Sequence, residues 1–73
     1  MDKLQLPPEY TLLEREGKFV LAFCPDNRLG RYATWMIGRE GLMCHGHYFP
    51  GPKQAAIDFE MRCGKIMGAL DAI

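Results

Sequence analysis

Residues Tyr32 to Phe49 decide the fold, and they read Tyr-Ala-Thr-Trp-Met-Ile-Gly-Arg-Glu-Gly-Leu-Met-Cys-His-Gly-His-Tyr-Phe. Two runs rich in aromatic, aliphatic and β-branched residues flank a central Arg-Glu-Gly. This pattern is typical of two antiparallel strands joined by a glycine turn. The stretch contains the only Trp and both His of the chain. We therefore expect most of the residues capable of recognition to lie on this hairpin.

The composition is that of one small globular domain. Of the 73 residues, 48% are hydrophobic and 25% are charged, which argues against disorder. A chain of this length needs most of its apolar side chains for the core, so an enclosed active-site pocket is not expected. Nine Lys and Arg balance nine Asp and Glu. A neutral chain lacks the long-range field that attracts nucleic acid or an anionic membrane.

The N-terminus and the cysteines indicate a cytoplasmic protein. The first residues, through Pro8, lack the basic start and apolar run of a signal peptide, and no stretch has the length of a membrane span. Cys24, Cys44 and Cys63 are scattered and form no Cys-x-x-Cys motif. We interpret them as reduced thiols that pack as small hydrophobic side chains.

The sequence predicts an arm and a first hairpin before the central stretch. Residues 1–9 form an extended arm that ends near Pro7-Pro8, and residues 10–73 form a single domain. Two apolar runs on either side of Glu16-Gly17 predict a hairpin with a positive φ at Gly17. The second run, Phe19 to Cys24, is apolar on both faces, which is typical of a strand inside a sheet.

The register of the central hairpin divides its side chains between two faces. A two-residue turn would pair Arg39 with Leu42 and Thr34 with His47, and would place the Trp35 indole over Gly46. We take the face with Trp35 as the better candidate for the core. That face carries Trp35, Ile37, Leu42, Cys44 and Tyr48, and the other face carries Tyr32, Thr34, Met36, Met43, His45, His47 and Phe49.

After Pro50-Gly51-Pro52 the hydrophobic period changes from that of a strand to that of a helix. We predict an amphipathic C-terminal helix with Pro52 in its first turn and its apolar side against the sheet. Ile57 and Met61 form a short apolar ridge on its other side, in line with Gly64 and Gly68. The predicted apolar side comprises Ala55, Ala56, Phe59, Cys63, Ile66, Met67, Leu70 and Ile73.

These elements predict an α+β fold. Four antiparallel strands in two hairpins form one sheet, and a single C-terminal helix packs on one of its faces (ββββα).

The sequence contains no catalytic signature, and we expect neither an enzyme nor a cofactor. The chain has no Ser, and on a regular strand Cys44 points away from the neighbouring His45. The glycines are spread through turns and form no phosphate-binding loop. His45 and His47 lie on the same side of one strand, as in some metal sites, but two ligands do not complete a zinc site. We favour no metal site and leave this pair to metal analysis.

The histidine-bearing face is unusually aromatic and rich in Met for a surface in contact with water, and such patches mark interfaces. Because the helix covers one face only, we expect a non-enzymatic interaction module that binds a protein partner or a second copy of itself. The predicted partner-binding residues are Tyr32, Met36, Met43, His45, His47 and Phe49.

The alternative is a nucleic-acid-binding accessory domain. Arg28, Arg31 and Arg39 lie around the third strand, and Tyr32 and Phe49 are candidates for stacking on bases. The neutral net charge weakens the phosphate attraction that normally dominates such binding, so we do not favour this alternative.

Short motifs in the chain resemble those of small domains encoded on bacterial plasmids, conjugative elements and phages. The motifs are Tyr32-Ala-Thr-Trp, Gly46-His47-Tyr48-Phe49 and the helical Asp58-Phe59-Glu60, and the likeness extends from Tyr10 to Cys63. The resemblance implies an accessory protein of a mobile element that engages a host or element-encoded protein or DNA. It transfers no residue role to this chain.

Overall fold

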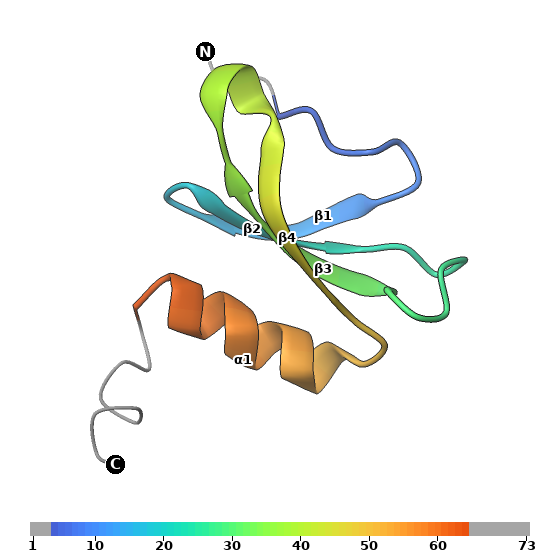
Figure 1. Ribbon diagram of the computed structural model, residues 1–73. Helices are drawn as coiled ribbons and strands as arrows, with labels where there is room; N and C mark the ends of the chain where they lie inside the picture. The colour runs from blue at the N-terminus through green and yellow to red at the C-terminus, as the bar shows by residue number, and fades with distance from the viewer. Residues whose placement is uncertain (1–3, 65–73) are drawn as a thin grey trace.

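The computed structural model describes residues 4–64 and confirms the predicted ββββα fold (Figure 1). All four strands pair antiparallel with their neighbours in the sequence, so the strand order across the sheet is β1-β2-β3-β4. The elements are β1 (Thr11–Glu16), β2 (Phe19–Phe23), β3 (Tyr32–Ile37), the 3-10 turn η1 (Arg39–Gly41), β4 (Met43–Phe49) and α1 (Pro52–Arg62).

Two different segments cover the two faces of the sheet. Helix α1 lies across one face (Figure 1), where Ala55 and Phe59 pack against Leu21. The N-terminal segment covers the other face, where Leu4 and Leu6 pack on a buried cluster. Strand β2 therefore has buried side chains on both sides, as its continuous apolar sequence predicts. The cluster under the N-terminal segment comprises Val20, Ala22, Ala33 and Trp35.

The N-terminal segment is anchored beside the β3–β4 turn. Gln5 forms a parallel β-bridge with Leu42, and its backbone N–H donates to the Gly41 carbonyl at 2.9 Å. Its side-chain Nε2 donates to the Glu40 carbonyl at 2.8 Å. These bonds hold the neighbouring leucines over the sheet, so the described part of the predicted arm contributes to the core.

The first hairpin has the predicted geometry. Glu16 pairs with Phe19, and the intervening Gly17 has a φ of 59°. Strand β1 forms one edge of the sheet, is exposed along its whole length, and has a bulge between Leu12 and Glu14. A bulge and charged side chains on an edge strand oppose pairing with other chains.

The second hairpin has a longer turn than predicted. Turn η1 occupies the predicted two-residue loop, with a positive φ at Glu40 (59°) and at Gly41 (82°). The Gly38 N–H donates to the Leu42 carbonyl at 2.6 Å and closes the loop. The predicted pairing of Arg39 with Leu42 is therefore wrong.

A β-bulge then restores the predicted register further along the hairpin. Ile37 pairs with Met43, one residue away from the predicted pairing. The register shifts again before Thr34, which pairs with His47 as predicted. His45 lies in this bulge and has a φ of 51°, a conformation that non-glycine residues rarely adopt.

The longer turn and the bulge each shift the register by one residue, and a shift of one residue moves a side chain to the opposite face. Three predicted face assignments are therefore wrong. Met43 was expected beside the histidines, but it packs on the Trp35 side of the sheet. Cys44 was expected on the Trp35 side, but it pairs with Met36. Leu42 was expected in the core, but it is exposed in the turn.

Helix α1 ends earlier than the hydrophobic pattern suggests. Gly64 adopts a φ of 82°, and its N–H donates to the Met61 carbonyl at 3.0 Å. A glycine in this conformation just after the last turn is a common helix terminator. The ridge residues Ile57 and Met61 are exposed, as predicted. Several residues of the predicted helix lie outside the described residues, namely Ile66, Met67, Gly68, Leu70 and Ile73.

Replacing Phe59 with Ala is expected to lower the free energy of unfolding by about 3 to 5 kcal/mol, because Phe59 is fully buried between α1 and the sheet. Ile57→Ala on the exposed side of the same helix is the matched control, with an expected change within about 0.5 kcal/mol. Urea unfolding followed by circular dichroism measures both changes. Equal effects of the two substitutions would contradict the packing described here.

Candidate functional site

The predicted partner-binding face is not a free surface, because α1 lies across it. Tyr32 and Phe49 are half-buried in the cluster beneath the helix, and Met36 is half-buried in the same sheet. Of the six predicted residues, only His45 and His47 are exposed. The expectation that this face stays open was wrong, because the N-terminal segment covers the Trp35 face and leaves the helix to cover the histidine face.

The two histidines have different surroundings. His45 lies exposed at the β-bulge, whereas Nδ1 of His47 lies 3.0 Å from Oδ2 of Asp58 on helix α1. Between residues 4 and 64, no three side chains of His, Cys, Asp or Glu gather into a metal site. His47 is therefore a polar contact between β4 and the helix.

Asp58 is the centre of a polar group that joins α1 to the sheet, which we call the helix clamp (Thr34, His47, Asp58 and Arg62). The hydroxyl of Thr34, which is fully buried, donates to Oδ2 of Asp58 at 2.5 Å. Nε of Arg62 lies 3.3 Å from the same oxygen, one helical turn away. Nη2 of Arg62 also donates to the His45 carbonyl at 2.5 Å. The clamp thus ties the helix to both β3 and β4.

The surroundings of Asp58 favour its charged form. Burial alone would raise the pKa of this carboxyl group. The hydrogen bonds from Thr34 and His47, together with the charges of His47 and Arg62, outweigh burial and lower the pKa below its ordinary value. The clamp is therefore built around an ionised carboxylate.

A His–Asp pair such as His47 and Asp58 can also belong to a catalytic site. Such a pair activates a Ser or Cys placed within hydrogen-bond reach of the imidazole. The chain has no Ser. The thiol of Cys44 instead contacts the Leu42 carbonyl, at 3.7 Å. We assign the clamp to anchoring the helix.

The three arginines of the nucleic-acid alternative do not form one patch. Arg28 and Arg31 lie in the loop before β3, whereas Arg39 follows β3 at its other end. A strand of six residues spans roughly 20 Å, so Arg39 lies far from the other two. All three side chains are exposed.

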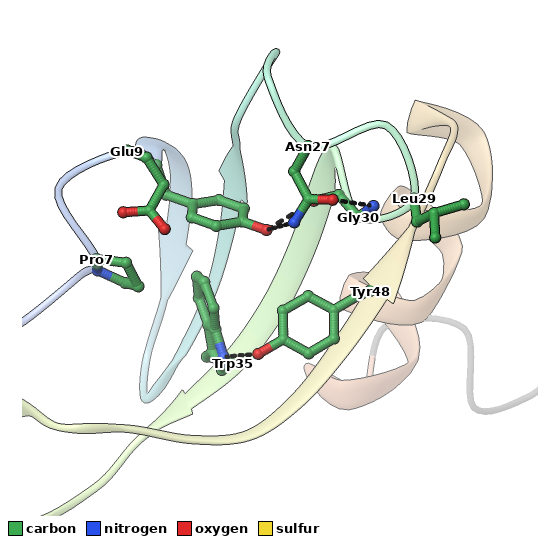
Figure 2. A pocket seen from close by; sticks show the side chains of 8 residues that line it. Pro7, Glu9, Asn27, Leu29, Gly30, Trp35 and Tyr48 are labelled. Carbon is green, nitrogen blue, oxygen red and sulfur yellow. Dashed lines mark hydrogen bonds between the residues drawn. The ribbon is translucent and has the colours of Figure 1, made fainter.

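A groove on the Trp35 side of the sheet was missed at the level of sequence. Its volume is about 420 Å³, and Figure 2 shows it between the N-terminal segment, the β2–β3 loop and β4. This volume lies within the range of small-ligand sites. The groove is lined by Pro7, Glu9, Tyr10, Asn27, Leu29, Gly30, Trp35 and Tyr48.

Three aromatic rings dominate the groove. The Tyr10 and Trp35 ring centroids lie 5.1 Å apart with an interplanar angle of 77°. Trp35 and Tyr48 lie 5.8 Å apart at 82°, so each tyrosine ring meets the indole nearly at a right angle. Nε1 of Trp35 donates to the Tyr48 hydroxyl at 3.3 Å (Figure 2). The indole is only 4% exposed, whereas Tyr48 is 54% exposed. We call these three residues the aromatic cluster.

Glycine at position 46 permits this arrangement. A Cβ atom at Gly46 would lie 2.5 Å from Nε1 of Trp35 and 2.8 Å from the Tyr48 hydroxyl. Any larger residue would therefore displace the indole or the phenol. The predicted contact of the Trp35 indole with a bare Gly46 backbone was the one signal of this site in the sequence. Tyr10 and the β2–β3 loop reach the groove only through the tertiary fold.

Comparison with known protein families, curated proteins and solved structures finds no match to this chain. In the described range 4–64, no helix is long and apolar enough to cross a membrane. The three cysteines form no disulfide in the described residues; Cys24 is buried, and Cys44 and Cys63 are half-buried.

The lowered pKa of Asp58 predicts a loss of stability in acid. A carboxyl group with a lower pKa in the folded chain than in the unfolded chain stabilises the fold above its unfolded pKa, near 4. That contribution disappears as the pH falls through the folded pKa. Asp58→Asn is expected to cost about 1 to 3 kcal/mol at neutral pH and to flatten the stability change below about pH 5.

Thermal unfolding of both chains across this pH range measures the effect. Asp26→Asn, in the exposed β2–β3 loop, is the matched control and should keep the acid dependence of the original chain. An unchanged acid dependence in Asp58→Asn would show that Asp58 does not hold the helix through its charge.

Proposed function

We propose that this chain is a non-enzymatic interaction module, acting in the cytoplasm, that binds a protein partner through the groove of the aromatic cluster. The observation that carries the proposal is the groove itself, with about 420 Å³ of space over Tyr10, Trp35 and Tyr48. An accessory protein of a mobile element, as the sequence resemblance implies, would use such a groove to engage a host or element-encoded protein.

The exposed apolar side chains around the groove support a macromolecular partner. Leu29, at the tip of the β2–β3 loop, is 85% exposed and lines the groove together with the half-exposed Tyr48. Tyrosine and tryptophan are enriched among the residues that dominate interface energies, because they bury a large rigid surface and keep one polar group. A partner that covered Leu29 and Tyr48 would remove both from water.

The groove is also held in place before any partner binds. The Tyr10 hydroxyl donates to the Gly30 carbonyl at 2.7 Å, and Asn27 donates to the Tyr10 hydroxyl at 3.3 Å. Oδ1 of Asn27 accepts from the Gly30 N–H at 3.1 Å. These bonds tie the β2–β3 loop to the start of β1, so a ligand would not have to order the walls of the groove.

A selection of random peptides on the immobilised chain tests this function. We expect enriched peptides to bind the original chain and to lose about tenfold or more in affinity with Tyr48→Ala or Leu29→Asp, as anchor residues of an interface do. Leu13→Asp is the matched control, because Leu13 is also half-exposed but lies on edge strand β1. Selected peptides that bound all variants equally would contradict the proposal.

Binding to nucleic acid is not expected. Titration of labelled duplex and single-stranded DNA at low salt measures it directly, because phosphate contacts are strongest there. Saturable binding that weakened with salt and with Arg28→Gln and Arg31→Gln would favour the nucleic-acid alternative over the groove.

A further inference from the structure

The polar atoms of the groove are already hydrogen-bonded to one another. The hydroxyl of Tyr10 bonds to Gly30 and Asn27, the amide of Asn27 bonds to Gly30 and Tyr10, and the hydroxyl of Tyr48 accepts from Trp35. These bonds use the Tyr10 O–H, the Asn27 amide and one lone pair of the Tyr48 oxygen, and they leave the Tyr48 O–H to donate. Most polar atoms of the groove already have a partner. The groove therefore favours a group that needs few hydrogen bonds.

Glu9 is the exception among the polar groups that line the groove. Within residues 4–64 its carboxylate makes no hydrogen bond or ion pair, and Figure 2 shows it on the Pro7 side of the groove, with Tyr48 on the other side. Among residues 4–64, no Lys or Arg lines the groove. Arg28, exposed on the neighbouring loop, is not part of the lining. The charge presented to a ligand is negative.

The electrostatic surroundings of Tyr10 are consistent with that charge. Burial raises the pKa of the Tyr10 hydroxyl, the hydrogen bond with Asn27 lowers it, and the nearby Cys24, Tyr48 and, least of the three, Glu9 raise it further. No basic side chain of the described residues contributes to this shift. The space beside Tyr10 therefore disfavours an added negative charge.

We propose that this groove recognises the methylated ammonium group of a trimethyllysine side chain in the partner protein. The inference rests on the proposed function and names the chemistry of its ligand. A quaternary ammonium group carries a positive charge, donates no N–H hydrogen bond, and is attracted to the faces of aromatic rings. Tyr10, Trp35 and Tyr48 supply the rings, and Glu9 supplies the opposite charge.

The side chain of a protein fits this site better than a free small cation. The groove is an open surface feature, and its rim extends to Leu29, which a small cation would leave exposed. The backbone around a trimethyllysine would instead pass over Leu29 and Tyr48 and cover them. An unmodified lysine carries three N–H donors that need acceptors, and Glu9 is the one carboxylate among the described residues that line the groove.

Trp35 is a built-in reporter of binding because it is the only Trp in the chain. Glycine-flanked peptides that carry trimethyllysine, unmodified lysine, or the neutral isostere with a tert-butyl group are titrated against the full chain. Indole fluorescence and the Nε1–H resonance of Trp35 follow binding. We expect trimethyllysine to bind about tenfold more tightly than the neutral isostere and than lysine. Free choline, titrated in the same way, should bind more weakly than the trimethyllysine peptide.

Two substitutions, at Tyr48 and at Glu9, test which side chains produce the preference for trimethyllysine. Tyr48→Leu keeps an apolar side chain but removes a ring, and should abolish the preference for trimethyllysine over the isostere. Glu9→Gln should lower the affinity for the trimethyllysine peptide about three- to fivefold and leave the affinity for the isostere unchanged. It should also make binding of the trimethyllysine peptide less sensitive to salt. Glu14→Gln on edge strand β1 is the matched control for charge and should leave the affinity for both peptides unchanged.

The outcomes separate this inference from the proposed function. Equal affinity for the three peptides, or an unchanged preference in Tyr48→Leu, would overturn the recognition of methylated ammonium. So would tighter binding of choline than of the trimethyllysine peptide, because that would assign the groove to a small molecule. The selected random peptides could still require Leu29 and Tyr48 in each case, and the interaction module would then stand with a different ligand.

Discussion

The β-bulge between β3 and β4 is the constraint on which both faces of the sheet depend. It places two residues of β4, His45 and Gly46, opposite the single residue Trp35. The bulge determines which face each side chain beyond it occupies, so that His47 lies beside Asp58 of the helix and Tyr48 lies against the indole. Without this extra residue the helix clamp and the aromatic cluster would not form on opposite sides of the same strands.

Both faces of this small sheet are apolar, so each must be shielded from water by another segment of the chain. Eleven residues of α1 cover one face, and the segment from Leu4 to Tyr10 covers the other. Beside Pro7, the N-terminal segment leaves space over Trp35. The groove is this remaining gap, bounded by the β2–β3 loop and Tyr48.

Polar and apolar contacts have separate tasks in this domain. The carboxylate of Asp58 bonds to Thr34, His47 and Arg62 and fixes where α1 lies on the sheet. Phe59 is the largest fully buried side chain of the helix. On the other face, hydrogen bonds hold the walls of the groove and leave ring surface accessible. Among the residues that suit chemistry by type, His47 contacts Asp58 of the helix and Cys24 is buried in the core. Aromatic residues from distant segments form the candidate site.

The sequence alone determined the class of the fold, because the strand and helix periods, the turn at Gly17 and the apolar β2 are local properties. It also placed Tyr48 on the same face as Trp35. Only the tertiary structure decided which face the helix covers and where the groove lies. Both depend on one extra residue in a bulge and on contacts between Tyr10 and a loop 17 residues further along the chain. Hydrophobic periodicity reports neither, since it describes neighbours in sequence and not the segments that meet in space.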